Sequence, residues 1–247
     1  MNLEEFFAQY PRTAVAFSGG ADSALVLWAA KRYGRETAAY YVHTAFQPAF
    51  ELADAQRLAA ELAVPLHVVE LDVLAVPEAA ANGPRRCYFC KKALFTALWQ
   101  AARADGYQVL LDGTNASDDA GDRPGMQALK ELEVHSPLRA CGITKDEVRR
   151  LSREAGLFTW DKPAYACLAT RVPTGTAITK EALAKVERGE DALFKLGFSD
   201  FRLRLLGEAA RLQVPRDQLE KAASLHGEIV QALGRDFSAV LLDLEGR

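Results

Sequence analysis

A short segment near the N-terminus combines serine, glycine and aspartate in a pattern that can hold a phosphate. The run Ser18-Gly19-Gly20-Ala21-Asp22-Ser23 follows the apolar, β-favouring residues 13–17 and precedes an amphipathic run at residues 24–33. This order predicts a strand, a tight loop and a helix. Glycine lets an anion approach the main chain, and a helix N-terminus carries roughly +0.5 charge. Asp22 fits such a site when Mg²⁺ lies between the carboxylate and the phosphate.

Two widespread phosphate loops do not match this segment, because one requires a lysine (GxxxxGK[ST]) and the other a GxGxxG spacing. An ordinary Gly-Gly turn capped by Asp22 or Ser23 is the plain alternative. Ser18 and Ser23 bring hydroxyl donors to the same loop, between an expected strand and an expected helix. We therefore interpret the segment as a phosphate-binding loop.

Three of the four cysteines lie in two polar segments. Cys87 and Cys90 form a Cys-x-x-Cys pair, and Cys167 lies in a long irregular stretch, residues 160–176. The pair by itself is compatible with a zinc site, a redox pair, iron–sulfur ligation or ordinary helix-start residues. Zinc requires a fourth ligand, for which Cys141 is the remaining thiol, and the thioredoxin-like context of a redox pair is missing. Three thiols would hold a four-iron cluster and leave one iron open for an exogenous sulfur.

The composition is that of an ordinary globular chain of 247 residues, with 49% hydrophobic and 26% charged residues. A net charge of −3 argues against a general attraction to nucleic acid. The first residues contain Glu4 and Glu5 without a long apolar block, and we expect no signal peptide, no membrane span and a cytoplasmic location. In that setting four cysteines favour metal binding or chemistry over disulfides.

Strand and helix patterns alternate over the first part of the chain, which predicts an α/β fold with a parallel sheet. Ligands of such sheets bind at the carboxyl ends of the strands, where the serine–glycine loop falls. A short extended segment is expected at residues 136–138, and Thr144 with Glu147 forms a capping box for a helix. The expected strands cover residues 13–17, 38–43, 66–71 and 109–111, and the expected helices cover 24–33, 50–62, about 93–104 and 144–155.

The pattern changes after residue 176 to helix, two strands, helix and strand, which predicts a small α+β domain. We accordingly place the domains at residues 1–176 and 177–247. The expected elements are helices at 180–196 and 216–233 and strands at 201–205, 210–214 and 239–244. Arg202 and Arg204 share one face of the first strand, and arginine forks suit phosphate, although a solvated sheet face is the alternative.

The loop resembles the SGGxDS loop of the PP-loop ATP pyrophosphatases. Within that group, five segments in order resemble the pyridinium-3,5-bisthiocarboxylic acid mononucleotide synthase (LarE) family, and together they cover nearly the whole chain. These are the Ser18–Ser23 loop, Arg86-Cys87-Tyr88-Phe89-Cys90-Lys91, Leu111-Asp112-Gly113-Thr114-Asn115 with Asp122-Arg123-Pro124-Gly125, Ala166-Cys167-Leu168-Ala169-Thr170-Arg171 with Pro173 and Gly175-Thr176, and Leu196-Gly197-Phe198 through Arg202-Leu203-Arg204.

The resemblance implies a PP-loop (adenine nucleotide alpha hydrolase-like) domain that holds ATP and Mg²⁺. A carboxylate of a pyridinium dicarboxylate mononucleotide attacks the α-phosphate, pyrophosphate leaves, and a sulfur nucleophile then converts the acyl-adenylate into a thiocarboxylate for a nickel-pincer cofactor. The implied catalytic residues are Ser18, Asp22 and Cys167, and the implied nucleotide-binding residues are Ser18, Gly19, Gly20, Asp22, Ser23 and Gly113.

The family follows two sulfur strategies. Members with only the equivalent of Cys167 sacrifice its sulfur, whereas members with three cysteines resemble carriers of a [4Fe-4S] cluster. This chain has all three, so we expect Cys87, Cys90 and Cys167 to be cluster ligands, with a sacrificial Cys167 as the alternative. The role of Cys141 stays open.

The resemblance also assigns the substrate phosphate to Arg202 and Arg204, with Glu190 nearby, and Arg171 is a further candidate to meet a phosphate or carboxylate. Gln213 is a departure, because the family often carries an acidic residue there. The expected partners are the nucleotide substrate, an unidentified sulfide donor and further copies of the chain in a homo-oligomer such as a hexamer. Two alternatives are a PP-loop tRNA thiolase, which needs a basic RNA-binding surface, and a non-catalytic regulator that binds ATP or a cluster.

Overall fold

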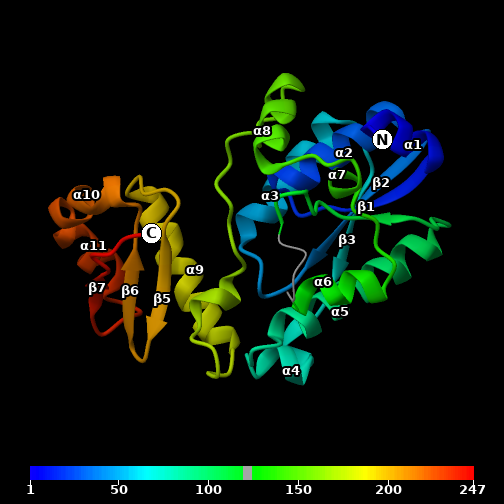
Figure 1. The fold of residues 1–247 in the computed structure, drawn as a ribbon. Helices are drawn as coiled ribbons and strands as arrows, with labels where there is room; N and C mark the ends of the chain where they lie inside the picture. Colours follow the sequence, from blue (N-terminus) through cyan, green and yellow to red (C-terminus); the bar gives the residue numbers. More distant parts are fainter. Residues whose placement is uncertain (119–123) are drawn as a thin grey trace. The chain divides into compact units, whose positions relative to one another are not determined.

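The computed structural model describes residues 1–118 and 124–247, which form two compact units (Figure 1). The first comprises Met1–Val76 and Arg85–Lys162, and the second comprises Pro77–Pro84 and Pro163–Arg247. The main division thus falls at residues 162 and 163, before the boundary expected at 176 and 177, and a short earlier segment joins the second unit. The division into two functional domains stays a prediction.

The first unit contains a four-stranded parallel sheet, as the alternating pattern predicts. Its strands are β1 (Arg12–Ala16), β2 (Glu36–His43), β3 (Leu66–Glu70) and β4 (Leu110–Leu111). The spatial order is β3-β2-β1-β4, and every pairing in it is parallel. Because β1 lies between β2 and β4, the segments that follow β1 and β4 leave the same edge of the sheet next to each other.

Alternate residues of a strand point to opposite faces, and helices cover both faces of the central strands β1 and β2. Helices α1 (Leu3–Gln9), α2 (Ala21–Tyr33), α7 (Pro137–Ala140) and α8 (Lys145–Glu154) pack on one face, and α5 (Arg86–Ala104) packs on the other. Val15, Ala39 and Tyr41 belong to one hydrophobic cluster, in which helices α1, α2, α7 and α8 supply most of the other side chains. Ala14 and Tyr40 belong to a second cluster on the other face, where α5 supplies Leu98, Trp99 and Ala102. The middle of each central strand, residues 14–16 of β1 and 38–42 of β2, is therefore a continuous apolar run, which is typical of parallel sheets.

Helices connect the strands of the first unit. Thr144 caps α8 as expected, because its side chain accepts the Glu147 N–H and the Glu147 carboxylate accepts the Thr144 N–H. The helices are α1 (Leu3–Gln9), α2 (Ala21–Tyr33), α3 (Ala49–Glu61), η1 (Val73–Ala75), α5 (Arg86–Ala104), α6 (Pro124–Glu131), α7 (Pro137–Ala140) and α8 (Lys145–Glu154).

Two local expectations are wrong. The segment that we expected to be extended at residues 136–138 begins the short helix α7, because Pro137 occupies the first helical position, where its fixed φ is favourable. The single helix expected at residues 216–233 is divided into η3 (Arg216–Gln218), α10 (Leu219–Ser224) and α11 (His226–Leu233). Leu225 separates the last two helices with a non-helical ψ of 19°.

The second unit is a small α+β structure with a three-stranded sheet of order β5-β6-β7. Strands β5 (Arg202–Leu206) and β6 (Ala209–Gln213) are antiparallel, and β7 (Val240–Leu242) runs parallel to β6. Its core combines Leu203 and Leu212 of the sheet with Leu193 of α9 and Leu233 of α11. The remaining helical elements are α4 (Pro77–Ala80), η2 (Leu168–Arg171) and α9 (Lys180–Lys195).

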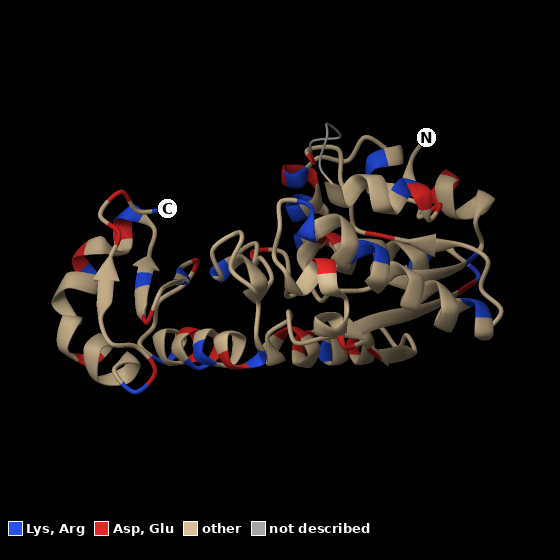
Figure 2. Cartoon of the chain, turned by 90° about the horizontal axis from the view of Figure 1, so that it is seen from below, with Lys and Arg blue, Asp and Glu red and all other residues tan. Residues whose placement is uncertain are grey.

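Acidic and basic residues are interspersed along the ribbon in both units (Figure 2). Among the residues that the structure describes, no helix combines the length and the apolar composition that a membrane crossing requires.

Candidate functional site

The expected phosphate loop closes the carboxyl end of β1. Helix α2 begins at Ala21 with Gly20 as its N-cap, so Asp22 and Ser23 lie in the first helical turn. The Ser23 hydroxyl accepts the Ser18 main-chain N–H at 3.3 Å, donates to the Gly20 carbonyl at 3.2 Å, and lies 3.1 Å from the Ser18 hydroxyl. These bonds hold the loop in a compact shape at the positive end of α2.

Two glycines are required by close approach of the main chain. Gly19 has a φ of +72°, and a Cβ placed there would lie 3.0 Å from the Glu51 carbonyl oxygen of α3. A Cβ at Gly113 would lie 2.8 Å from the Ser23 main-chain nitrogen. Gly113 therefore lets the segment after β4 pack directly against the start of α2, where we expected a nucleotide-binding residue.

Asp22 is held by two donors from other segments. The Asn115 amide donates to its Oδ1 at 3.0 Å, and the Lys145 ammonium lies 2.5 Å from its Oδ2. The Asp22 and Lys145 side chains are 27% and 33% exposed, so an incoming ion can reach them. This arrangement places a carboxylate and a cation beside the loop, as binding of a magnesium–nucleotide complex requires.

Sequence reasoning missed Lys145 and Lys162. Lys145 is the first residue of α8, where a cation is unfavourable next to the helix dipole, and that misfit is the signal that points to a carboxylate partner. Lys162 donates to the Gly19 carbonyl at 3.2 Å and to Asp54 at 2.6 Å. It ties the loop to α3, and no local pattern in the sequence indicates this long-range contact.

The loop borders a cavity of about 290 Å³ within the first unit. Lys91 of α5, Gln47 and Asp118 contribute polar groups to its wall, and Tyr40, Phe95 and Leu98 contribute apolar surface. The cavity thus combines a polar end at the loop with an apolar wall, as a nucleotide site does. Its lining includes the predicted residues Ser18, Gly20, Asp22, Ser23 and Gly113.

The neighbouring Asp112 stabilises the turn that follows β4. It is 5% exposed, and its carboxylate accepts the Ser136 hydroxyl at 2.6 Å, the Thr114 main-chain N–H at 3.3 Å and the Thr114 hydroxyl. These bonds fix the turn that presents Gly113 and Asn115. The other expected residues of this motif, Asp122 and Arg123, lie outside the described residues.

Cys87 and Cys90 lie near the start of α5, three residues apart and thus on neighbouring positions of one helix face. Cys87 is exposed, Cys90 is partly buried, and an Arg86 guanidinium nitrogen lies 3.7 Å from the Cys87 sulfur. Cysteine sulfur is a common ligand of zinc and of iron–sulfur clusters. The donor type and spacing therefore fit a pair of cluster ligands.

Cys167 belongs to the second unit, where it precedes η2. Within residues 1–118 and 124–247, no three His, Cys, Asp or Glu side chains are gathered closely enough to hold a metal ion. The assignment of all three cysteines to one cluster therefore stays a prediction. Cys141 packs against the core of the first unit, and burial raises the pKa of its thiol, which fits a small hydrophobic residue.

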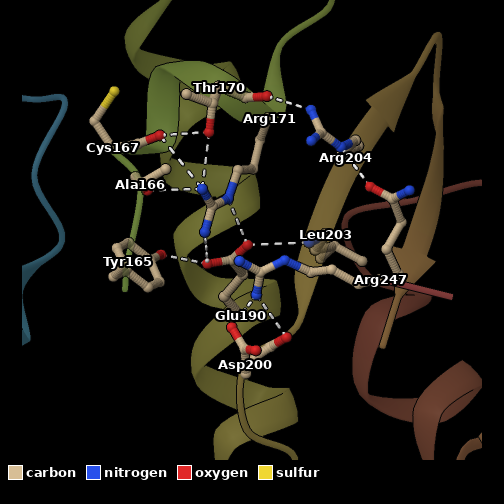
Figure 3. A network of polar contacts seen from close by, with 11 residues as sticks. Tyr165, Ala166, Cys167, Thr170, Arg171, Glu190, Asp200, Leu203, Arg204 and Arg247 are labelled. Atoms are coloured by element: carbon tan, nitrogen blue, oxygen red, sulfur yellow. Dashed lines mark hydrogen bonds and ion pairs between the residues drawn. The ribbon is translucent and has the colours of Figure 1, made fainter. Parts of the chain in front are cut away.

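Arg171 and Glu190 form a buried ion pair beneath the Cys167 segment (Figure 3). The Arg171 Nε and a terminal nitrogen donate to the two Glu190 oxygens at 2.7 and 3.0 Å. Its other terminal nitrogen donates to the carbonyls of Ala166 at 2.7 Å and Cys167 at 3.4 Å. The guanidinium thereby holds the main chain on both sides of the cysteine.

Glu190 is fully engaged within the protein. Besides Arg171 it accepts the Tyr165 hydroxyl and the Leu203 main-chain N–H, so one carboxylate links the Cys167 segment to β5 (Figure 3). Burial by itself lowers the pKa of Arg171, and the hydrogen bonds and charge of Glu190 outweigh it, so that this pKa lies above its usual value. The contacts seen for both residues are structural, and their expected contact with a substrate phosphate stays a prediction.

Arg202 and Arg204 lie on the face of β5 opposite the buried Leu203, as the alternation predicts. Arg204 donates to the Thr170 carbonyl at 2.8 Å (Figure 3) and to the Gln213 amide oxygen at 2.5 Å. Burial lowers the pKa of both guanidinium groups, and the charges of neighbouring arginines lower it further. Crowded, half-buried cations of this kind are a favourable environment for an anion.

Comparison with known proteins is consistent with this geometry. The family model for the queuosine biosynthesis protein QueC matches residues 12–81, which contain the loop and the first three strands. The chain is 40% identical over 252 residues to the uncharacterized protein slr1717 of Synechocystis sp., with 99% of this chain and 93% of the relative covered.

Two further relatives have named activities. The chain is 33% identical over 240 residues to a pyridinium-3,5-bisthiocarboxylic acid mononucleotide synthase of Lactiplantibacillus plantarum, with 95% of this chain and 86% of the relative covered. It is 23% identical over 210 residues to a tRNA-specific 2-thiouridylase, MnmA 2, of Clostridium botulinum, with 71% and 60% covered.

Replacing Gly113 by alanine tests the close approach at the loop. The added methyl group would overlap the main chain at Ser23, and we expect Gly113→Ala to lower the free energy of unfolding by about 1–3 kcal/mol. Urea unfolding measures this loss. Gly83→Ala is the matched control, because a Cβ there meets no atom within 4 Å and its unfolding free energy should change little.

Removing the Glu190 carboxylate tests the buried ion pair. Glu190→Ala leaves the Arg171 charge buried without its partner, and the expected loss of unfolding free energy is about 3–5 kcal/mol. The control is Asp236→Ala, which removes the exposed Arg188–Asp236 pair and should cost under about 1 kcal/mol. Circular dichroism in urea measures the free energy of unfolding of both variants. Equal losses in the two variants would contradict the structural role of Glu190.

Proposed function

The chain belongs to the family of pyridinium-3,5-bisthiocarboxylic acid mononucleotide synthases, and we propose that it adenylates a carboxylate of a pyridinium dicarboxylate mononucleotide and replaces it by a thiocarboxylate. The family places it among the ATP-dependent sulfurtransferases of nickel-pincer cofactor synthesis, with a PP-loop that uses ATP and Mg²⁺. The proposal concerns the individual substrate, the source of the sulfur and the residues that act.

One observation carries the proposal: residues of the loop, Asp22 and Gly113 line the same cavity, which has a polar end at the loop and an apolar wall. Main-chain N–H groups at the start of α2 and the hydroxyls of Ser18 and Ser23 would bind the phosphates of ATP. Asp22 would bind Mg²⁺ when Lys145 moves from the carboxylate to a phosphate oxygen. The Lys145 ammonium and the Mg²⁺ that Asp22 would hold would neutralise part of the charge of the departing pyrophosphate.

The chemistry divides into two displacements. An oxygen of the substrate carboxylate attacks the α-phosphorus of ATP, and the bond to pyrophosphate breaks. A sulfur nucleophile then attacks the carboxyl carbon of the acyl-adenylate, AMP leaves with the former carboxylate oxygen, and a thiocarboxylate results. Adenylation is needed because an oxide ion is a very poor leaving group, and a thiolate or sulfide is a strong nucleophile near neutral pH.

The three cysteines are proposed as the sulfur-delivery site. Cys87, Cys90 and Cys167 would ligate a [4Fe-4S] cluster, which supplies an iron without a protein ligand for an exogenous sulfide. Arg171 would hold the Cys167 segment in place through the two carbonyls that it binds. The alternative sulfur source is Cys167 itself, which would lose its sulfur in a single turnover.

The substrate phosphate is proposed to bind between Arg202 and Arg204. Neither guanidinium forms an ion pair with a carboxylate in the described part of the chain, and both residues lie on the face of β5 opposite the buried Leu203. We extend the proposal to a cytoplasmic location and a homo-oligomer. A tRNA thiolase is the second candidate, since the similarity to the thiouridylase covers 71% of the chain, but the interspersed charges provide little support for an RNA surface (Figure 2).

Pyrophosphate release tests the adenylation step. Wild-type protein should release pyrophosphate from ATP with a pyridinium-3,5-dicarboxylate mononucleotide and not with bulk tRNA. Asp22→Ala should lower the rate roughly a hundredfold or more, because the charge that holds Mg²⁺ is lost. Asp191→Ala, at an exposed position of α9, is the control and should retain the wild-type rate.

The outcomes separate the candidates. Release that depends on tRNA would favour the thiolase, and ATP binding without any release would favour a non-catalytic regulator. Either result overturns the proposed reaction.

Anaerobic purification tests the sulfur source. If the three thiols hold a cluster, the protein should be brown, contain about four iron atoms per chain and show visible charge-transfer absorption. Cys87→Ser should lose the colour, whereas Cys141→Ser should keep it because Cys141 packs in the core. A colourless protein that turns over once, with the mass loss of one hydrogen sulfide at Cys167, would establish the sacrificial route instead.

A further inference from the structure

Gln213 connects a guanidinium to a carboxylate on the open face of the second sheet. The Arg204 Nε donates to the Gln213 amide oxygen at 2.5 Å, and the Gln213 amide nitrogen donates to an Asp243 oxygen at 2.7 Å. Arginine can only donate and an ionised carboxylate can only accept, so the amide has a single orientation that satisfies both neighbours. Gln213 thus positions Arg204 with a neutral group.

The charges on this side of the unit do not balance. Three arginines face carboxylates: Arg171 pairs with Glu190, Arg247 with Asp200, and Arg211 lies 3.8 Å from Asp243. Arg202 and Arg204 have no such ion pair among the residues that the structure describes. Two positive charges are therefore left for a ligand.

The residue at position 213 determines whether the positive charges of Arg202 and Arg204 stay uncompensated. In the β5–β6 register Gln213 lies opposite Arg202, and its side chain reaches Arg204, so it touches the surroundings of both cations. A carboxylate at this position would neutralise Arg204. It would also face Asp243 across a distance at which two carboxylates repel each other or share a proton or a cation.

We infer that Gln213 is a positioning and specificity residue, which fixes the Arg204 guanidinium through an uncharged hydrogen bond so that Arg202 and Arg204 bind a phosphate monoester dianion. A phosphate monoester carries about −1.5 to −2 charges at neutral pH, which matches the two uncompensated guanidinium groups. Arginine forks bind such groups through paired N–H···O bonds. The inference rests on the proposed binding of the substrate phosphate by Arg202 and Arg204. It adds Gln213 as the residue that keeps the positive charge of this site uncompensated.

Arg204 is also tied to the cysteine segment, because it donates to the Thr170 carbonyl at 2.8 Å. With Nε on Gln213 and one terminal nitrogen on Thr170, its plane is defined by two neutral acceptors. Neutral acceptors orient a guanidinium without cancelling its charge, and the remaining N–H groups stay available to an anion.

Calorimetric titration of the full-length protein tests this inference, with inorganic phosphate and nicotinic acid mononucleotide as probes and nicotinic acid riboside as the phosphate-free reference. Gln213→Glu should weaken binding of both phosphate probes by roughly 10- to 100-fold, because Arg204 is neutralised. Riboside binding should not change. Gln231→Glu adds the same charge at an exposed position of α11 and should leave all affinities within about twofold.

Gln213→Met separates charge from lost hydrogen bonds, because methionine has nearly the same size and leaves Arg204 charged. Its phosphate affinity should fall clearly less than that of Gln213→Glu. An equal fall in both variants would overturn the inference, and so would an unchanged affinity of Gln213→Glu in a protein whose Arg204→Ala variant loses binding. If Arg202→Ala and Arg204→Ala themselves bind phosphate normally, the clamp in the proposed function fails, and the inference fails with it.

Discussion

Close contact between main-chain segments at the carboxyl edge of the parallel sheet underlies the first unit. Gly19 has a positive φ and leaves little room for a Cβ beside α3, and Gly113 lies so close to the start of α2 that a Cβ would overlap the main chain. Because side chains are missing at these two points, the ends of β1 and β4 and the beginning of α2 converge. The cavity, the serine hydroxyls and the Asp22 carboxylate owe their positions to this convergence.

The second unit depends on a different constraint, the buried Glu190 carboxylate. A buried charge must be paired and hydrogen-bonded, and Glu190 meets this demand with Arg171, Tyr165 and the main chain of β5. The ion pair with Arg171 and these hydrogen bonds offset the cost of burying the Glu190 charge, and they hold the irregular segment around Cys167 in place. The arginines on the open face of the sheet are left with fewer carboxylates than charges, and Gln213 maintains that excess.

Local patterns predicted much of this architecture. The alternation of strand and helix patterns indicated the parallel sheet, because parallel strands require a crossover connection between them. Thr144 with Glu147 indicated the start of α8, because a capping box depends on neighbouring residues alone. The failures are also local in origin. Leu225 interrupts a pattern that looks continuously helical, and Pro137 begins a short helix where we expected an extended segment.

The amino-acid sequence by itself determined the phosphate loop, the three cysteines and the paired arginines, because these features are defined by residue type and short spacing. Only the tertiary structure decided which distant groups contact these segments. Lys145 meets Asp22, Lys162 meets the Gly19 carbonyl, and Glu190 meets Arg171 across long stretches of chain. Such pairings depend on how distant elements pack, and the periodicity of a single segment contains no information about its partner's charge.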